Sequence, residues 1–279
     1  SCPDVLVMTA TPIPRTLTLT VYGDLDVSVI DELPPGRGKI STYVRQSKKH
    51  LSDSVKFLKT KLGEGRQAYV VYPLIEDSEK IKVGSVEGEF QKWSESLSPF
   101  KCELLHGRIA PDEKDSIMGR FRDGAIHVLI STTVIEVGVD VPNATIMYVF
   151  DAERFGLAQL HQLRGRIGRG EHNSYCVLMT GKLTGEAKEK LGVLEQSSDG
   201  FVIAEADLKL RGPGELLGKA QSGIDRLKLG DLITETELVK QARSLSSTLI
   251  ESDPNIENPE NLHLRKLIMF DDDNDGVVA

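Results

Sequence analysis

The sequence predicts an α/β protein, in which an open parallel sheet carries helices on both faces and is followed by a mostly helical C-terminal extension. Between residues 36 and 182, short apolar runs of strand length alternate with amphipathic helical stretches, which is typical of a parallel sheet with crossover helices. Beyond Thr180 the apolar runs stop and polar helical segments take over. No apolar run approaches about 18 residues, so we expect no membrane span.

The first predicted strand covers residues 5–11 and is followed by a loop. Pro34-Pro35-Gly36 then breaks the chain and indicates a domain linker. After this linker the order becomes strand, helix, strand, helix. A stripe of apolar residues at helical spacing predicts the first helix, which ends near Gly63; the stripe consists of Leu51, Val55, Leu58 and Leu62.

Residues 68–75 form a nearly continuous apolar run, as in a strand covered on both faces. The same alternation continues to residue 179. It predicts helical stretches at 90–97 and 112–121 and strands at 102–105, 127–130, 144–150 and 174–179. We therefore divide the chain into the end of a preceding domain with its linker (1–35), one open α/β domain (36–182), a helical region (183–250) and an acidic, flexible tail (251–279).

The composition is that of a folded protein, with 279 residues of which 39% are hydrophobic and 27% charged. These values exclude a disordered chain, a collagen and a coiled-coil rod. Residues 251–279 hold eight acidic and two basic residues and so contribute −6 to the net charge of −8. Because the remaining chain is nearly neutral, the net charge does not exclude a local basic face.

Three widely spaced cysteines without a CxxC pair favour a reduced, intracellular protein and argue against a disulfide framework or a zinc site. The chain begins Ser1-Cys2-Pro3-Asp4, which is no secretory signal and lacks an initiator Met. We therefore expect a piece cut from a longer, cytoplasmic protein, with bacterial cytoplasm as the default. No feature of the sequence indicates an oligomer, so we expect a monomer.

Four loops are candidates for a ligand site, because ligands bind at the carboxyl ends of strands in open parallel sheets. The sequence contains four informative loops, and we expect all four at that edge. They are Thr9-Ala10-Thr11, Leu104 to Arg108, Ile130 to Asp140 and Gln159 to Gly170.

The last of these loops carries two arginines at helical spacing. If residues 162–169 are helical, Gln162, Arg166 and Arg169 share one face at ~100° per residue. A guanidinium group binds phosphate through two parallel hydrogen bonds. The two arginines are therefore candidate arginine fingers, which contact the phosphates of a nucleotide held by a neighbouring domain. The alternative is a solvated basic helix or a surface turn with salt bridges.

No phosphate-binding loop is present in the sequence. Gly36-Arg37-Gly38-Lys39-Ile40-Ser41 fails the pattern because Leu33 and Ile40 stand where Gly and Ser or Thr are required. The acidic run from Asp271 to Gly276 opens like a calcium loop, but the chain stops before the twelfth position, so we expect no metal site. The chain alone is therefore expected neither to bind ATP with Mg²⁺ well nor to hydrolyse it.

Several motifs resemble those of the RecG family of superfamily-2 DNA helicases, over residues 5–245. The matching stretches are Met8 to Leu17, Tyr22 to Leu25, Ile30 to Gly36, Glu153 to Arg166, Asp199 to Phe201 and Asp207 to Glu215. The transcription-repair coupling translocases share the early and middle motifs and rank second. The resemblance implies a RecA-like second motor domain at 36–182 and a translocation-motif region at 183–250.

The resemblance also implies roles for single residues. Arg166 and Arg169 would be catalytic arginine fingers. The residues implied to bind or sense ATP are Gln162, Glu136, Gly138 and Asp140; those implied to contact DNA are Thr132, Thr133, His106, Gly107, Arg108, Arg211 and Gln221; and those implied to couple hydrolysis to movement are Thr9 and Thr11. Lys219-Ala220 precede Gln221 where the family usually has Thr-Arg.

Several of these residues also have a plain structural interpretation. Thr132 and Thr133 are suited to capping a helix, and Gly138 to a tight turn. His106 is by default an ordinary loop histidine, and Arg108 and Arg211 are suited to surface ion pairs.

The function implied by the resemblance is ATP hydrolysis coupled to translocation on branched double-stranded DNA, in recombination and repair. ATP and Mg²⁺ would be held mainly by an N-terminal motor domain of the same protein, which would also supply a wedge domain. The alternatives from other classes are a nucleotide-free DNA-binding module and one half of an RNA helicase.

Overall fold

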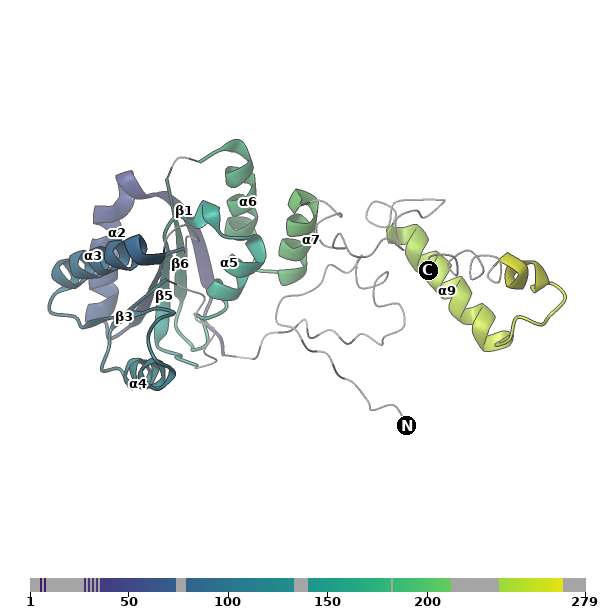
Figure 1. Cartoon of the computed structure of the whole chain (residues 1–279), viewed down its shortest axis with the longest axis horizontal. Helices are drawn as coiled ribbons and strands as arrows, with labels where there is room; N and C mark the ends of the chain where they lie inside the picture. The colour runs from purple at the N-terminus through teal and green to yellow at the C-terminus, as the bar shows by residue number, and fades with distance from the viewer. Residues whose placement is uncertain are drawn as a thin grey trace. The chain divides into compact units, whose positions relative to one another are not determined.

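The computed structural model describes residues 36–73, 79–132, 140–181, 183–211 and 236–267, together with residues 6, 8, 28, 30, 32 and 34. The described ranges fall into two units, one at 36–211 and the other at 236–267 (Figure 1). The predicted strand at 5–11 lies outside the described residues except for Leu6 and Met8.

Six parallel strands form one sheet in the larger unit, in the order β1-β6-β5-β2-β4-β3 (Figure 1). The strands are β1 (Ile40–Gln46), β2 (Gln67–Val71), β3 (Cys102–Leu105), β4 (Val128–Ser131), β5 (Ala144–Val149) and β6 (Ser174–Thr180). Neighbours in the sheet are far apart in the chain, so helices must cross between them.

Helices cover both faces of this sheet. On one face lie α2 (Ser47–Gly63) and α3 (Glu79–Leu97); on the other lie α4 (Pro111–Arg122), α5 (Leu157–Arg164), α6 (Gly185–Gln196) and α7 (Gly200–Arg211). A 3-10 turn, η1 (Ala152–Arg154), precedes α5. No helix in the described part of the chain is long and apolar enough to cross a membrane.

The alternation of side chains along the strands explains these two layers. Tyr69 and Val71 of β2 pack in the core beneath α4 and α5, whereas Ala68 and Val70 pack beneath α2 and α3. Successive strand residues point to opposite faces, so a strand that is apolar throughout needs cover on both sides. All five residues of β2 are buried. The predicted fold class is therefore confirmed.

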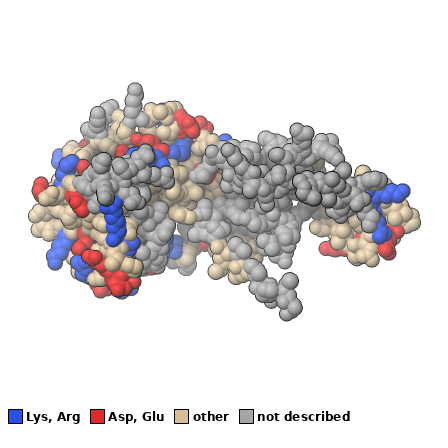
Figure 2. Space-filling model, in the orientation of Figure 1, with Lys and Arg blue, Asp and Glu red and all other residues tan. Residues whose placement is uncertain are grey.

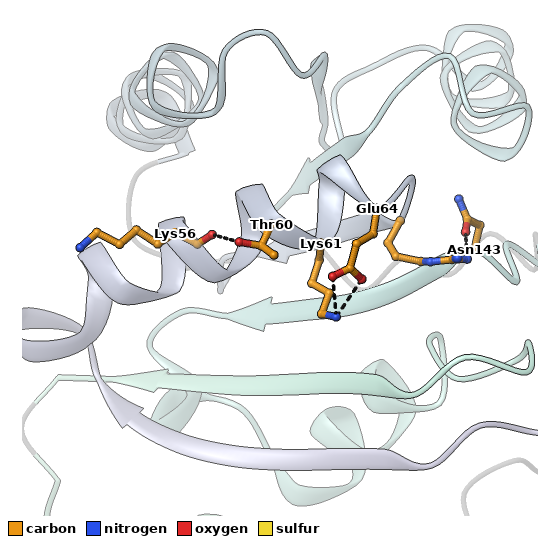
Figure 3. A network of polar contacts seen from close by, with 6 residues as sticks. Lys56, Thr60, Lys61, Glu64 and Asn143 are labelled. Atoms are coloured by element: carbon orange, nitrogen blue, oxygen red, sulfur yellow. Dashed lines mark hydrogen bonds and ion pairs between the residues drawn. The ribbon is translucent and has the colours of Figure 1, made fainter.

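A polar network closes the end of α2 before β2 begins (Figure 3). The Lys61 ammonium donates to both carboxylate oxygens of Glu64, at 2.8 and 3.1 Å. It also lies 5.9 Å from the centroid of the Phe57 ring and 5.8 Å from that of Tyr175 on β6. This contact seats the last turn of α2 on the sheet.

Asn143 holds the starts of β2 and β5 together (Figure 3). Its side-chain oxygen accepts from the Arg66 guanidinium at 2.9 Å, and its amide donates to the Gly65 carbonyl at 2.7 Å. Its own carbonyl accepts from the Gln67 backbone N–H at 3.0 Å. The amino ends of the two central strands are therefore joined by one residue.

The smaller unit contains helix α9 (Thr236–Ser252) and a turn around Asp253. Helix α9 continues through Ser252, and residues 262–267 are helical. Between them the buried Asp253 carboxylate accepts from the backbone N–H groups of Glu257 and Asn258, each at 2.9 Å, and from the Asn261 amide at 3.0 Å. These bonds form an Asx-type turn, in which the carboxylate replaces a backbone acceptor. The acidic composition of the segment does not indicate such a turn. Residues 268–279 lie outside the described residues.

The cysteines at 102 and 176 are both free. Burial raises the pKa of the Cys176 thiol to about 12 and that of Cys102 to about 11. Both thiols are therefore protonated at neutral pH, and Cys176 packs as a small apolar group in the core.

Candidate functional site

The predicted site residues lie at two opposite edges of the sheet, which corrects the expectation that all four loops meet at the carboxyl ends of the strands. His106 and Thr132 follow the last residues of β3 and β4. Asp140 precedes β5, and the Gly170 carbonyl accepts from the Gly38 N–H, just ahead of β1. The reason is geometric: a helix that follows a parallel strand runs back across the sheet, so the residues after α5 return to the amino edge.

The arginines lie in a turn rather than on a helix, which overturns the helical interpretation of residues 162–169. Helix α5 ends at Arg164, and Gly168 adopts a φ of +74°. This left-handed conformation is accessible to glycine at little cost. Gln162 is thus exposed on α5, whereas Arg166 and Arg169 belong to the segment 165–170, which we call the arginine turn.

Arg169 has two partners at the amino edge. Its Nη1 lies 3.6 Å from Oδ1 of Asp140, and its Nε donates to the Gly165 carbonyl at 3.2 Å. The Arg169 side chain is 29% exposed and that of Asp140 56%, so solvent weakens the attraction between them. The ion pair therefore orients Arg169 more than it stabilises the fold.

The Arg166 side chain is partly exposed, and its guanidinium group makes no hydrogen bond or ion pair within the described ranges; its backbone N–H donates to the Leu163 carbonyl at 2.9 Å. Both Arg166 and Arg169 act electrostatically on the Tyr69 hydroxyl on β2. Burial raises the pKa of Tyr69 to about 12, against the opposing effect of the two guanidinium groups. The two positive charges therefore both act on one buried hydroxyl of the central strand β2.

A third arginine in this sequence, Arg164, was not among the predicted site residues and has a different environment. It is 5% exposed, and its guanidinium donates to the carbonyls of Leu194 at 3.0 Å and Ser197 at 2.8 Å. It thereby joins α5 to the segment between α6 and α7. The sequence offered one signal for this burial: Arg164 is one helical turn after the buried Leu160, so the two side chains lie on the same face of the helix.

At the carboxyl edge, the residues after β3 and β4 come together as predicted. The Thr132 N–H donates to the Leu105 carbonyl at 3.3 Å, and Nδ1 of His106 accepts from the Arg108 N–H at 3.3 Å. Gly107 and Arg108 are exposed. Lys114 on α4, which was not predicted, donates to the Gly107 carbonyl at 3.0 Å and adds a positive charge to this loop.

Acidic and basic side chains are interspersed over the face drawn in Figure 2, with acidic groups gathered over α4. The first turn of α4 contains Asp112 and Glu113, where carboxylates favour the positive end of the helix dipole. Positive charge for a phosphate is therefore local, at the loop of Arg108 and Lys114 and at the arginine turn.

The remaining predicted residues lie outside the described ranges or are described only in part. Arg211 is the last residue of α7, and only its backbone is described. Six predicted residues lie outside the described residues: Thr9, Thr11, Thr133, Glu136, Gly138 and Gln221. Thr132 lies at the carboxyl edge and Asp140 at the amino edge, and residues 133–139 between them lie outside the described residues.

Two family models match the chain. The helicase conserved C-terminal domain matches residues 49–171, and the model described as "ATP-dependent DNA helicase RecG, domain 3, C-terminal" matches residues 197–270. The second match extends the resemblance beyond the predicted limit of residue 245 and includes the Asp253 turn.

Curated relatives named ATP-dependent DNA helicase RecG align with nearly the whole chain. The protein from Synechocystis sp. is 49% identical over 266 residues, covering 95% of this chain and 32% of the relative. The protein from Bacillus subtilis is 47% identical over 265 residues, covering 94% of this chain and 39% of the relative. The chain thus spans about a third of the length of these relatives.

A solved structure titled "Structure of RecG bound to three-way DNA junction" is 43% identical, with a TM-score of 0.68. The match covers 87% of this chain and 30% of that one. It agrees with the parallel six-stranded sheet described above, whose fold is that of a RecA-like helicase domain. The chain therefore belongs to the RecG family of ATP-dependent DNA helicases and carries the family's helicase C-terminal domain.

Proposed function

We propose that this chain is the arginine-donating part of an ATP-driven motor that translocates on branched DNA such as forks and Holliday junctions. Its relatives are named ATP-dependent DNA helicases, and one related structure is titled as bound to a three-way junction. Because the chain spans about a third of these relatives, a further motor domain would hold most of the nucleotide.

The observation that carries this proposal is the pair of guanidinium groups on one short turn at the amino edge. Planar guanidinium groups match the oxygens of a phosphate, and they stabilise the charge that develops during phosphoryl transfer. Arg166 and Arg169 fit the terminal phosphate of ATP, which supplies the transferable phosphoryl group when bound. The nearby Asp140 carboxylate is paired with Arg169, so we assign Mg²⁺ to ligands of the other motor domain.

Arg166 and Arg169 would perform different tasks. Arg166 is the less restrained of the two and would reach a phosphate oxygen with little rearrangement. Arg169 is already held by Asp140 and the Gly165 carbonyl, so its head group is oriented before the nucleotide arrives. Such preorganisation lowers the barrier because little reorganisation remains for the reacting state.

The carboxyl edge is the proposed DNA interface. Arg108 and Lys114 supply positive charge there, and Thr132 and the exposed backbone of Gly107 offer hydrogen-bonding groups. Contacts of this type recognise the phosphate backbone without reading its sequence. The segment from Thr132 to Asp140 would couple DNA contact at this edge to Arg169 at the other.

The test is the DNA-stimulated ATPase of the longer polypeptide that contains this chain and its partner motor domain. We expect Arg166→Ala to lower hydrolysis about 10³- to 10⁵-fold, as for other arginine fingers, with nearly unchanged affinity for forked DNA. Arg120→Ala is the matched control, because Arg120 pairs with Glu103 on β3 at the far end of the sheet.

Two outcomes would decide against the proposal. Hydrolysis by Arg166→Ala within about twofold of the parent, with fork binding retained, would refute the role of Arg166 as an arginine finger. Unwinding of duplex RNA in preference to forked DNA would favour an RNA helicase.

A further inference from the structure

The backbone that enters the sheet at β1 is bonded to the backbone that leaves the arginine turn. The Gly38 N–H donates to the Gly170 carbonyl at 2.9 Å, and the Ser174 N–H donates to the Lys39 carbonyl at 2.8 Å. The Lys39 N–H donates to Oδ1 of Asn173 at 3.3 Å. Residues 38–39 and 170–174 therefore form one short bonded ribbon, just before β1 and β6 begin.

At Gly38 the two backbone segments of this ribbon approach each other most closely. A Cβ atom at Gly38 would overlap the carbonyl group of His172 and lie 2.9 Å from the Asn173 nitrogen. Both neighbours are backbone atoms, which cannot rotate away as the end of a flexible side chain can. Any residue larger than glycine at position 38 must therefore push residues 172–173 away from β1.

Two further glycines enclose the arginine turn from other sides. A Cβ at Gly168 would lie 2.6 Å from Cδ1 of Ile40 on β1, and a Cβ at Gly170 would lie 2.9 Å from the Pro142 carbonyl ahead of β5. The turn is thus packed between the starts of β1 and β5. Arg169 lies between these two contacts, so its backbone has little room to shift.

We infer that Gly38 is a positioning residue for Arg169, acting through its backbone contact with residues 170–172. This inference rests on the proposed function, because it concerns how well Arg169 is aimed at a phosphate. A displacement of about 1 Å in a catalytic group costs up to about 100-fold in rate. The chain just before Gly38 is the predicted linker, and the hydrogen bond between Gly38 and Gly170 joins its end to the arginine turn.

The first test needs no nucleotide and uses the 279-residue chain. Hydrogen exchange of peptides that cover residues 165–174 is compared between the parent, Gly38→Ala and the control Gly119→Ala. Gly119 lies in α4, and a Cβ there has no neighbour within 4 Å. We expect exchange in that segment to rise at least about tenfold in Gly38→Ala and to stay unchanged in Gly119→Ala, since only the first variant disturbs the ribbon.

The second test uses the longer polypeptide and separates positioning from loss of folded protein. We expect Gly38→Ala to lower kcat for ATP hydrolysis about 10- to 100-fold. Its affinity for ADP with aluminium fluoride should fall by a similar factor, while its affinities for ADP and forked DNA stay within about twofold. A smaller folded fraction would lower the binding stoichiometry instead of the affinity.

A milder variant covers the case in which Gly38→Ala does not fold. Asn173→Ala removes the acceptor of the Lys39 N–H without adding volume, and we expect the same changes at about two- to fivefold. Parent-like exchange and parent-like affinity for the fluoride complex in the folded variants would overturn the inference. Arg169→Ala is measured beside them: if it also hydrolyses ATP normally, the proposed function fails, whereas if it alone is inactive, only the positioning role fails.

Discussion

Replacing Arg164 by alanine should destabilise the larger unit strongly, although Arg164 lies two residues from the proposed finger Arg166. The side chain is buried and makes its two shortest hydrogen bonds to the carbonyls of Leu194 and Ser197. These carbonyls lie where α6 ends, and a truncated side chain would leave them without this charged donor. The same substitution would also open a void between α5 and the turn that leads to α7.

The expected loss is about 2–4 kcal/mol. A hydrogen bond from a charged donor contributes about 1.5–3 kcal/mol, and two such bonds are lost. Part of this loss in stability is offset, because the variant no longer has to bury a guanidinium group. Burial lowers the pKa of Arg164, which reflects the cost of keeping its charge out of water. Arg164→Lys should recover a fraction, because an ammonium keeps the charge but cannot reach several carbonyls in a planar fork.

Urea unfolding followed by tryptophan emission measures this loss. Trp93 is the only tryptophan in the chain and is buried on α3, so its emission reports on the larger unit. Arg122→Ala is the control, because that side chain is 59% exposed and faces Asp123 at 3.7 Å; we expect a change below about 0.5 kcal/mol. A loss below about 1 kcal/mol for Arg164→Ala would refute the claim that its carbonyl contacts stabilise the helix packing.

Two predictions concern pH. Hydrogen bonds from the Asn261 amide, and then from the backbone N–H groups of Glu257 and Asn258, hold the pKa of Asp253 below its usual value. The turn should therefore be fully stable above that usual value and lose stability as the pH falls from about 5 toward 2. Hydrogen exchange of residues 253–261 checks this, and Asp253→Asn should abolish the dependence; an equal dependence in both proteins would contradict it. At the alkaline end, burial raises the pKa of Tyr69 and of Tyr148 to about 12, against about 10 in the unfolded chain. The contribution of these tyrosines to the free energy of unfolding should be complete below about pH 10 and fall above it by about 1.4 kcal/mol per pH unit for each tyrosine. Denaturant unfolding at several pH values measures this slope, and Tyr148→Phe should remove the part that Tyr148 contributes. A free energy of unfolding that does not change above about pH 10 would contradict the prediction.

The elements of the larger unit were predictable because each depends on neighbours in the chain. The apolar run at 68–75 indicates a strand buried on both faces, and β2 is buried throughout. The stripe from Leu51 to Leu62 marks the buried side of α2, where Leu58 and Leu62 pack in the core. Strand and helix periods are local properties, so they can be read without the fold.

The candidate site was predictable in its residue types but not in its arrangement. The spacing of Arg166 and Arg169 indicates phosphate chemistry, yet the helix expected to align them ends at Arg164. Gly168 turns the backbone, with its positive φ, next to Ile40 of β1. A glycine pattern alone does not distinguish a helix that another chain approaches from a turn packed within its own domain.

What the sequence by itself determined is the set of strands and helices, their parallel α/β class and the basic groups available for a phosphate. Only the tertiary structure decided that the arginine turn faces the amino edge while Arg108 and Thr132 face the carboxyl edge. That decision depends on contacts such as the hydrogen bond between Lys39 and Asn173, which are 134 positions apart. The free energy of such a contact depends on how separate elements pack together, and no short stretch of sequence contains that information.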